Sequence, residues 1–208
     1  MHIYQKREKE SMINKTTALV AGALILATPS LAKDSYDYSQ HNLKVKTGNI
    51  AVTYRDHADL DKWMAQVDYK IAYDFGVAYR YQESKGDVEH RFRLNTPNLL
   101  KLGGFSTSAR VEWREFDKES KDDFGNVWLQ LKYKHKIGGA SVYAKVQPKF
   151  AFDNDKFSDG EFYSAQNIVG VDYKLGGGYS VGMYVEQNTD EDWKVESEYI
   201  GTNISYKF

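Results

Sequence analysis

The chain has 208 residues, with 28 Lys or Arg against 29 Asp or Glu, and it contains no cysteine. A formal net charge of −1 provides no bulk basicity, which argues against nucleic acid as a partner. The absence of cysteine excludes a disulfide framework and any cysteine-based metal site.

The amino-terminal region carries an export signal. An apolar run at 18–27 follows Lys15, Pro29 breaks it, and Ser30 and Ala32 provide the small residues of a cleavage site. Residues 1–32 are therefore predicted to be a signal peptide, too short to cross a membrane as a helix. Met12 is an alternative start, because residues 12–15 would open an ordinary signal.

From residue 49 onward the chain reads as strands in which apolar and polar side chains alternate, so the two faces of each strand meet different surroundings. The predicted strands are 49–55, 63–73, 75–83, 88–95, 105–115, 127–137, 140–152, 163–175, 179–187 and 195–208. Leu43 and Val45 also alternate, but the phase slips at Gly48. A bulge or a short segment before the first strand would explain the slip.

The connections between these strands alternate in composition. One set is short and rich in glycine, at 73–76, 137–139 and 175–178, with a longer member at 95–104. The other set is acidic, at 56–61, 83–87, 117–123, 153–161 and 190–192. Short turns on one side and longer loops on the other are typical of bacterial outer-membrane barrels.

The last strand ends on alternating apolar residues, Ile204, Tyr206 and Phe208, which we interpret as the assembly signal of such a barrel. The predicted fold is all-β, an antiparallel transmembrane β-barrel of ten strands with up-and-down topology, with eight or twelve strands as alternatives. We expect it to close between the strand near 50–54 and the last strand. Residues 33–48 would be an N-terminal periplasmic segment, and 49–208 the barrel.

The two faces of the strands carry different chemistry. The apolar face includes Val67, Tyr69, Val111 and Leu129, while the opposite face carries thirteen Lys or Arg against five acids. The predicted lumenal path consists of Arg80, Arg91, Arg93, Arg110, Arg114, Lys132, Lys134, Lys145 and Lys149. A hydrated wall of this kind would attract anions. The competing interpretation is structural, with Arg80, Arg91 and Arg110 paired to Glu89, Glu112 and Asp68.

A resemblance to a known family rests on short motifs. Residues 50–55 (IAVTYR) and 75–80 (FGVAYR), the proline in 145–149 (KVQPK) and the closing 206–208 (YKF) resemble the oligogalacturonate-specific porins, small monomeric channels for acidic sugars. Members of that family are similar in topology but have twelve strands, so ten strands would narrow the lumen. The resemblance implies that inward Arg and Lys form a path for sugar carboxylates, without catalysis.

The functional expectation is a channel for small anionic solutes, such as acidic oligosaccharides, in the outer membrane of a Gram-negative bacterium. The alternative is a non-conducting structural or surface-binding barrel with a plugged lumen. We expect no enzyme, because the chain lacks Gly-x-Ser-x-Gly, His-Glu-x-x-His and phosphate-loop motifs. We also expect no cofactor and no metal. The expected partners are outer-membrane lipid, the barrel-assembly machinery and the solutes, with no nucleic acid, and the chain would act as a monomer. Changing Arg91, Arg93 and Arg110 together to Ser should shift selectivity toward cations and leave folding largely intact.

Overall fold

A computed structural model describes residues 38–118, 121–153 and 158–208. The predicted signal peptide, 1–32, lies outside them. The strands are β1 (Tyr38–Thr47), β2 (Ile50–His57), β3 (Lys62–Lys70), β4 (Gly76–Ser84), β5 (Asp87–Asn95), β6 (Leu100–Leu102), β7 (Phe105–Phe116), β8 (Phe124–Ile137), β9 (Ala140–Phe152), β10 (Phe162–Gly176), β11 (Tyr179–Thr189) and β12 (Val195–Lys207). One 3-10 turn, η1 (Ala72–Asp74), joins β3 to β4. In the described part of the chain, no helix has the length and apolar character needed to cross a membrane.

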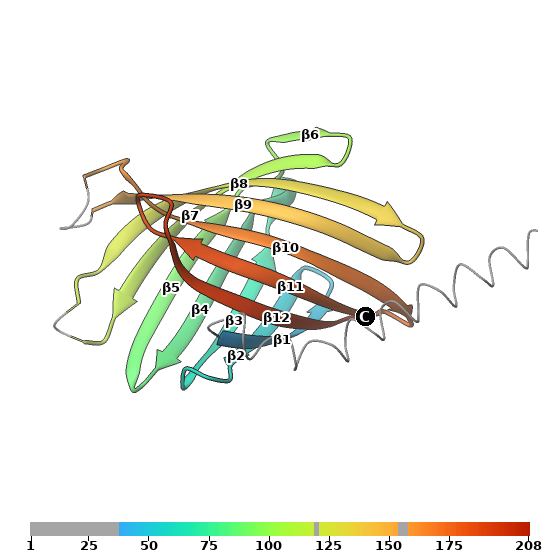
Figure 1. Cartoon of the computed structure of the whole chain (residues 1–208), viewed down its shortest axis with the longest axis horizontal. Helices are drawn as coiled ribbons and strands as arrows, with labels where there is room; N and C mark the ends of the chain where they lie inside the picture. Colours follow the sequence, from blue (N-terminus) through green and yellow to red (C-terminus); the bar gives the residue numbers. More distant parts are fainter. Residues whose placement is uncertain (1–37, 119–120, 154–157) are drawn as a thin grey trace, which may run out of the picture.

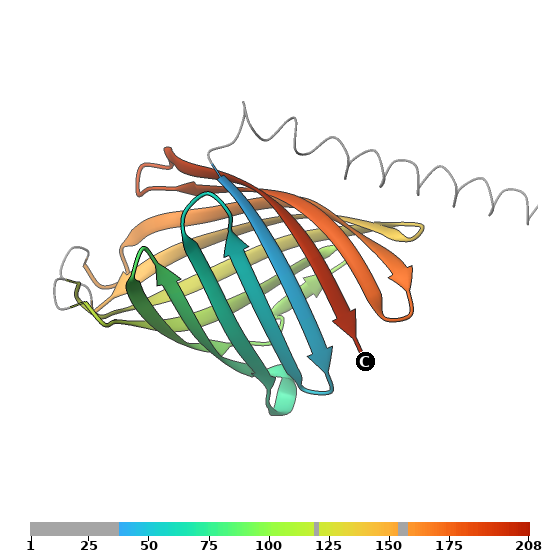
Figure 2. The ribbon, with the colours of Figure 1, turned by 90° about the horizontal axis from the view of Figure 1, so that it is seen from below.

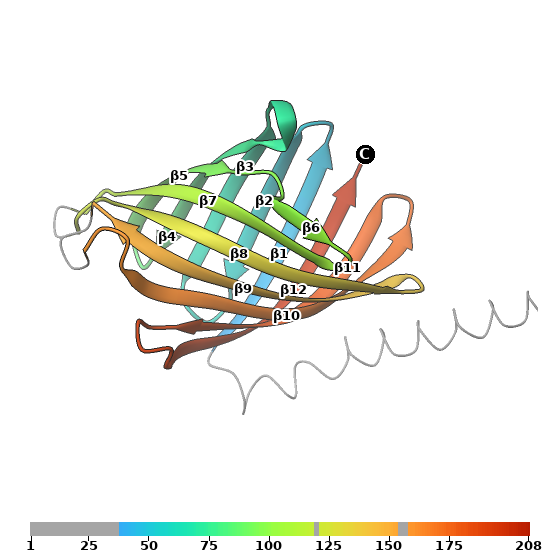
Figure 3. The ribbon, with the colours of Figure 1, turned by 90° about the horizontal axis from the view of Figure 1, so that it is seen from above.

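The strands form one sheet that closes on itself as a barrel (Figures 1 and 3). Each strand pairs with its neighbour in the chain, except that β5 pairs directly with β7 across the excursion that contains β6. Eleven strands make up the closed barrel, and the three residues of β6 add a short extension beside β7. The all-β barrel is therefore confirmed, with a strand number inside the predicted range of eight to twelve.

The closure differs from the expectation. β12 pairs with β1, not with the strand at 50–57, and the two strands run parallel, with Leu43 opposite Ile204 (Figure 2). Every other ladder between described strands is antiparallel. A parallel pair is unavoidable here, because an odd number of strands in up-and-down order brings the first and last strands together in the same direction.

The segment before the predicted first strand was misassigned. Residues 38–47 are not a periplasmic segment but the first strand of the barrel. The phase slip at Gly48 is neither a bulge nor a segment boundary. It is a two-residue hairpin turn, in which Thr47 pairs with Ile50 and Gly48 adopts a φ of 51°. Glycine is favoured there because a side chain would be strained at positive φ.

The two ends of the barrel differ in composition, as the sequence predicted. The connections β2–β3, β4–β5, β7–β8, β9–β10 and β11–β12 lie at one end. The acidic segments lie in these connections or, at β4–β5, in the strand ends beside the turn, while the predicted glycine-rich turns lie at the other end. β1 begins at the acidic end, where the backbone N–H and hydroxyl of Ser39 both donate to Asp59, at 2.9 and 2.8 Å. The backbone N–H and then the hydroxyl lower the pKa of Asp59 from its usual value.

The predicted division of the faces is confirmed. Apolar side chains such as Val67, Tyr69, Leu129 and Val169 point outward and are exposed, with Val67 at 47%. The buried inward side chains are mostly polar or charged, among them Gln40, Gln82, Glu89, Arg93 and Glu112. Outward aromatic pairs lie toward both ends, for example Phe162 with Trp193 at the acidic end and Tyr179 with Tyr206 at the other. The sheet is thus apolar outside and polar inside.

Candidate functional site: a basic cavity inside the barrel

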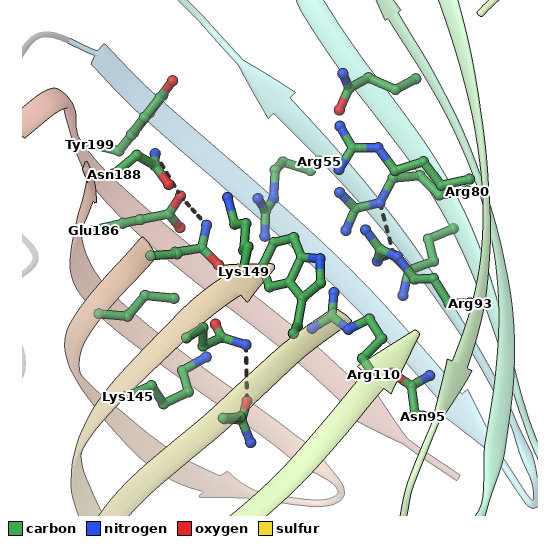
Figure 4. Close-up of a pocket in the computed structure, with 18 of the residues that line it drawn as sticks. Arg55, Arg80, Arg93, Asn95, Arg110, Lys145, Lys149, Glu186, Asn188 and Tyr199 are labelled. Atoms are coloured by element: carbon green, nitrogen blue, oxygen red, sulfur yellow. Dashed lines mark hydrogen bonds between the residues drawn. The ribbon is translucent and has the colours of Figure 1, made fainter. Parts of the chain in front are cut away.

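The barrel interior contains a cavity of about 410 Å³, lined by side chains from β2 to β12 (Figure 4). Among the described residues that line it, eight are basic and only Asp68 and Glu186 are acidic. The basic residues are Arg55, Lys62, Arg80, Arg91, Arg93, Arg110, Lys145 and Lys149. Alternation along each strand produces this lining, because residues two apart, such as Arg91 with Arg93, point to the same face.

Two buried carboxylates hold four of the arginines on β5 and β7. Glu112 accepts from Arg93 Nε and lies 3.5 Å from Arg91 Nη1 and 3.8 Å from Arg110 Nη1. Glu89 accepts from Arg91 Nη2 at 2.8 Å and from Arg114 Nε. Glu112 is only 1% exposed, so these are buried ion pairs, which persist because each charge has several partners. This part of the wall matches the structural interpretation.

Two other arginines are held by side-chain amides. Arg55 Nε donates to Asn42 Oδ1 at 2.6 Å, and Arg80 Nε donates to Gln66 Oε1 at 2.9 Å. The structural interpretation paired Arg80 with a carboxylate, whereas its partner is neutral. An amide orients a guanidinium without cancelling its charge, so Arg55 and Arg80 present more of their charge to the cavity than an arginine bonded to a carboxylate does.

The wall formed by β8 and β9 combines cations with aromatic rings. Arg110 and Lys149 lie 4.5 and 4.4 Å from the ring centroid of Trp128, whose indole N–H donates to Asn126. Lys145 lies 5.5 Å from the ring of Tyr143, which Lys132 also approaches, at 5.6 Å. Cation–π contacts of this kind stabilise positive charge without neutralising it.

The opposite wall is rich in amides. Glu186 is buried and accepts from Gln40, Gln166 and Asn188, at 3.1, 2.6 and 3.4 Å. Figure 4 places Glu186, Asn188 and Tyr199 across the cavity from Arg80, Arg93 and Arg110. The charge of the lining is therefore uneven, with most of the cations away from β11 and β12.

Six of the nine predicted path residues line the cavity: Arg80, Arg91, Arg93, Arg110, Lys145 and Lys149. Of the other three, Arg114 is held by Glu89, Lys132 lies beside Tyr143, and Lys134 is on β8 outside the lining. The role of all nine in solute passage stays a prediction. Sequence reasoning missed Arg55 and Lys62. Alternation with the apolar Val52 and Tyr54 was a signal in the sequence that could have placed Arg55 on the inner face.

The proposed assembly residues lie on the outer face of β12 and at its end. Ile204 is half exposed, while Tyr206 stacks on Tyr179 and contacts Phe208. Their part in assembly stays a prediction. Within the described ranges, no three His, Asp or Glu side chains gather in a way that could hold a metal ion.

No protein-family model matches the chain, and no curated protein matches it, so the resemblance to oligogalacturonate-specific porins finds no support there. Among solved structures, OccK11 (OpdR) of Pseudomonas aeruginosa is 13% identical with a TM-score of 0.32, covering 73% of this chain and 54% of that one. The outer membrane protein opdK of Pseudomonas aeruginosa is 12% identical with a TM-score of 0.30, covering 69% and 51%. The chain spans about half the length of these two structures. The fold described above rests on the strand ladders of this chain alone.

Proposed function

We propose that the protein is an outer-membrane channel of a Gram-negative bacterium that passes small anionic solutes. This proposal rests on one observation: a closed barrel holds a cavity that is lined by eight Lys or Arg side chains and two acidic side chains. A charged lining in a low-dielectric wall concentrates ions of opposite sign and repels those of the same sign. Acidic oligosaccharides are a candidate solute class, because their carboxylates suit the guanidinium fork.

The outer surface supports a membrane location for this channel. The outward side chains form an apolar surface, with aromatic pairs toward both ends of the barrel. This is the pattern expected where a barrel meets lipid and its two interfaces. In this proposal the outward face contacts outer-membrane lipid, and the barrel-assembly machinery inserts the chain into the membrane. The channel is a monomer and catalyses no reaction.

The test is the reversal potential of the purified protein in a planar bilayer under a salt gradient. We expect anion preference that weakens as the salt concentration rises. The lining charges act over roughly 8–10 Å at physiological salt, and added salt screens them so that they act over a shorter distance. Changing Arg55, Arg80 and Lys145 together to Gln should shift selectivity toward cations. Lys85→Gln, in the exposed β4–β5 turn, removes a charge outside the cavity and should change it little. Cation preference in the unmodified protein would contradict the proposal.

A second candidate function is a non-conducting barrel that acts through its acidic loops. The ion pairs of Glu89 and Glu112 and the buried rings of Trp128, Tyr143 and Tyr184 favour it, because they fill part of the interior. Folded protein that shows no conductance at any salt concentration would favour this candidate over the channel.

A further inference from the structure

The two arginines held by amides differ from the other arginines of the wall. Arg93 and Arg114 donate through Nε to the carboxylates of Glu112 and Glu89. Arg55 and Arg80 donate through the same atom to neutral oxygens, those of Asn42 and Gln66. Gln66 Oε1 also accepts from Arg93 Nη1 at 2.6 Å, so Arg93 has both a carboxylate and an amide partner. A guanidinium gripped at Nε keeps its two terminal amino groups for another partner, and beside an amide it also keeps its charge.

The two amides are themselves fixed. Asn42 Nδ2 donates to the hydroxyl of Tyr184 at 2.6 Å and to the carbonyl of Thr202 at 3.3 Å, so its oxygen faces Arg55. Gln66 Nε2 donates to Asp68 Oδ1 at 2.8 Å, which turns its oxygen toward Arg80 and Arg93. Both guanidinium groups are therefore oriented by neighbours that are already held, which lowers the ordering cost of binding a ligand.

The two charges also converge. Arg55 on β2 and Arg80 on β4 both line the cavity and are only partly buried, and Figure 4 shows them directed into the same space. The positive charges of Arg55 and Arg80 repel one another, and Arg55 also repels the charges of Arg110 and Lys145. An anion between them would offset this repulsion, and one with two charges would offset more of it than one with a single charge.

We propose that Arg55 and Arg80 form a saturable binding site for a doubly charged tetrahedral oxyanion, of the class of phosphate, a phosphate monoester or sulfate. Guanidinium groups bind such oxygens through paired N–H donors, and two cations that are bonded to amides and not to carboxylates match a dianion. Asn42 and Gln66 act as positioning residues, because their side-chain oxygens orient the two guanidinium groups toward the anion. The inference deepens the proposed channel by naming a solute class, but binding at this site does not require conduction.

Equilibrium binding to the purified full chain, in detergent free of phospholipid, tests the site. Isothermal titration calorimetry with sodium sulfate, and separately with inorganic phosphate, should give saturable one-site binding in chloride buffer at constant ionic strength. Sodium acetate should bind at least about tenfold more weakly, because a monoanion leaves one cation uncompensated. Equal affinities for sulfate and acetate, or heats that do not saturate, would overturn the proposal.

Two charge-neutralising variants separate this site from the general charge of the cavity. Asn42→Asp makes the acceptor of Arg55 a carboxylate, and Gln66→Glu does the same for the acceptor that Arg80 shares with Arg93. Each should weaken sulfate binding roughly tenfold to hundredfold. Gln130→Glu adds the same charge to the same cavity, where Gln130 contacts Ser108 and Gln147 and neither arginine. It should change binding far less. An equal loss in all three folded variants would show that only the net charge matters and would contradict the site.

The same protein in a planar bilayer distinguishes this inference from the channel itself. Anion-selective current without saturable sulfate binding would contradict the binding site but agree with the channel function. Saturable sulfate binding without current would contradict the channel function but agree with the binding site.

Discussion

At the scale of single residues, Glu112 organises the most buried part of the wall. Its carboxylate contacts Arg91, Arg93 and Arg110, which come from two adjacent strands. This changes the expectation for replacing those three arginines together. Their loss would leave Glu112 buried without a cation, so folding would suffer along with selectivity.

Replacing Glu112 itself should be costly. Glu112→Gln leaves three guanidinium groups without their shared counter-charge, and breaking a buried ion pair costs about 3–5 kcal/mol of unfolding free energy. Heat-modifiable migration on gels and urea unfolding in detergent would measure the loss. Glu191→Gln, in the exposed β11–β12 loop, makes the same chemical change and should leave the unfolding midpoint nearly unchanged. Equal midpoints for the two variants would mean that the Glu112 pairs add nothing to stability.

At the scale of elements, the parallel seam between β1 and β12 decides how the barrel closes. Inward-facing Lys44 lies opposite Ser205 in that register. Neighbouring strands bring paired Cα atoms within the 4.4–6.8 Å range that a disulfide needs.

A pair of cysteines tests the seam directly, because the chain has no cysteine of its own. Lys44→Cys combined with Ser205→Cys should form a disulfide in the folded protein, visible as a shift on a non-reducing gel. Lys44→Cys with Ser197→Cys, eight residues earlier on β12 and more than about 20 Å away, should remain reduced. The opposite pattern would show that β1 does not close the barrel in this register.

A second feature at this scale is the packing of tyrosine rings over glycines on the next strand. Tyr184 on β11 covers Gly201 on β12, and a Cβ atom added at Gly201 would overlap the ring. Tyr143 covers Gly170 in the same way.

Gly201→Ala should therefore lower the unfolding free energy by about 1–3 kcal/mol, because Tyr184 must move and strain its bond to Asn42. Gly76→Ala is the matched control, since a Cβ atom there meets nothing nearer than the carbonyl oxygen of Tyr69 at 3.5 Å. Unfolding midpoints in urea would compare the two. Similar midpoints would show that the ring adapts without cost.

At the scale of the whole molecule, the faces of the strands were predictable and the partners across strands were not. Two-residue alternation placed Arg91 and Arg93 inside without any knowledge of register. The pairing of Arg93 with Glu112 depends on how β5 meets β7 across residues 96–104, which alternation does not specify. β1 was missed because the polar residues before Gly48 concealed a strand whose outward side chains include Leu43 and Val45. The acidic and glycine-rich ends were predictable because loop composition is local.

The eleven-strand count has a consequence for sidedness. β1 begins at Tyr38 at the acidic end, whereas β12 runs toward Phe208 at the glycine-turn end (Figure 2). An epitope inserted just before Tyr38 and another fused after Phe208 should therefore emerge on opposite sides of any membrane that the barrel crosses. A protease applied to intact cells should remove one epitope and spare the other. A barrel with an even number of strands would expose or protect both together.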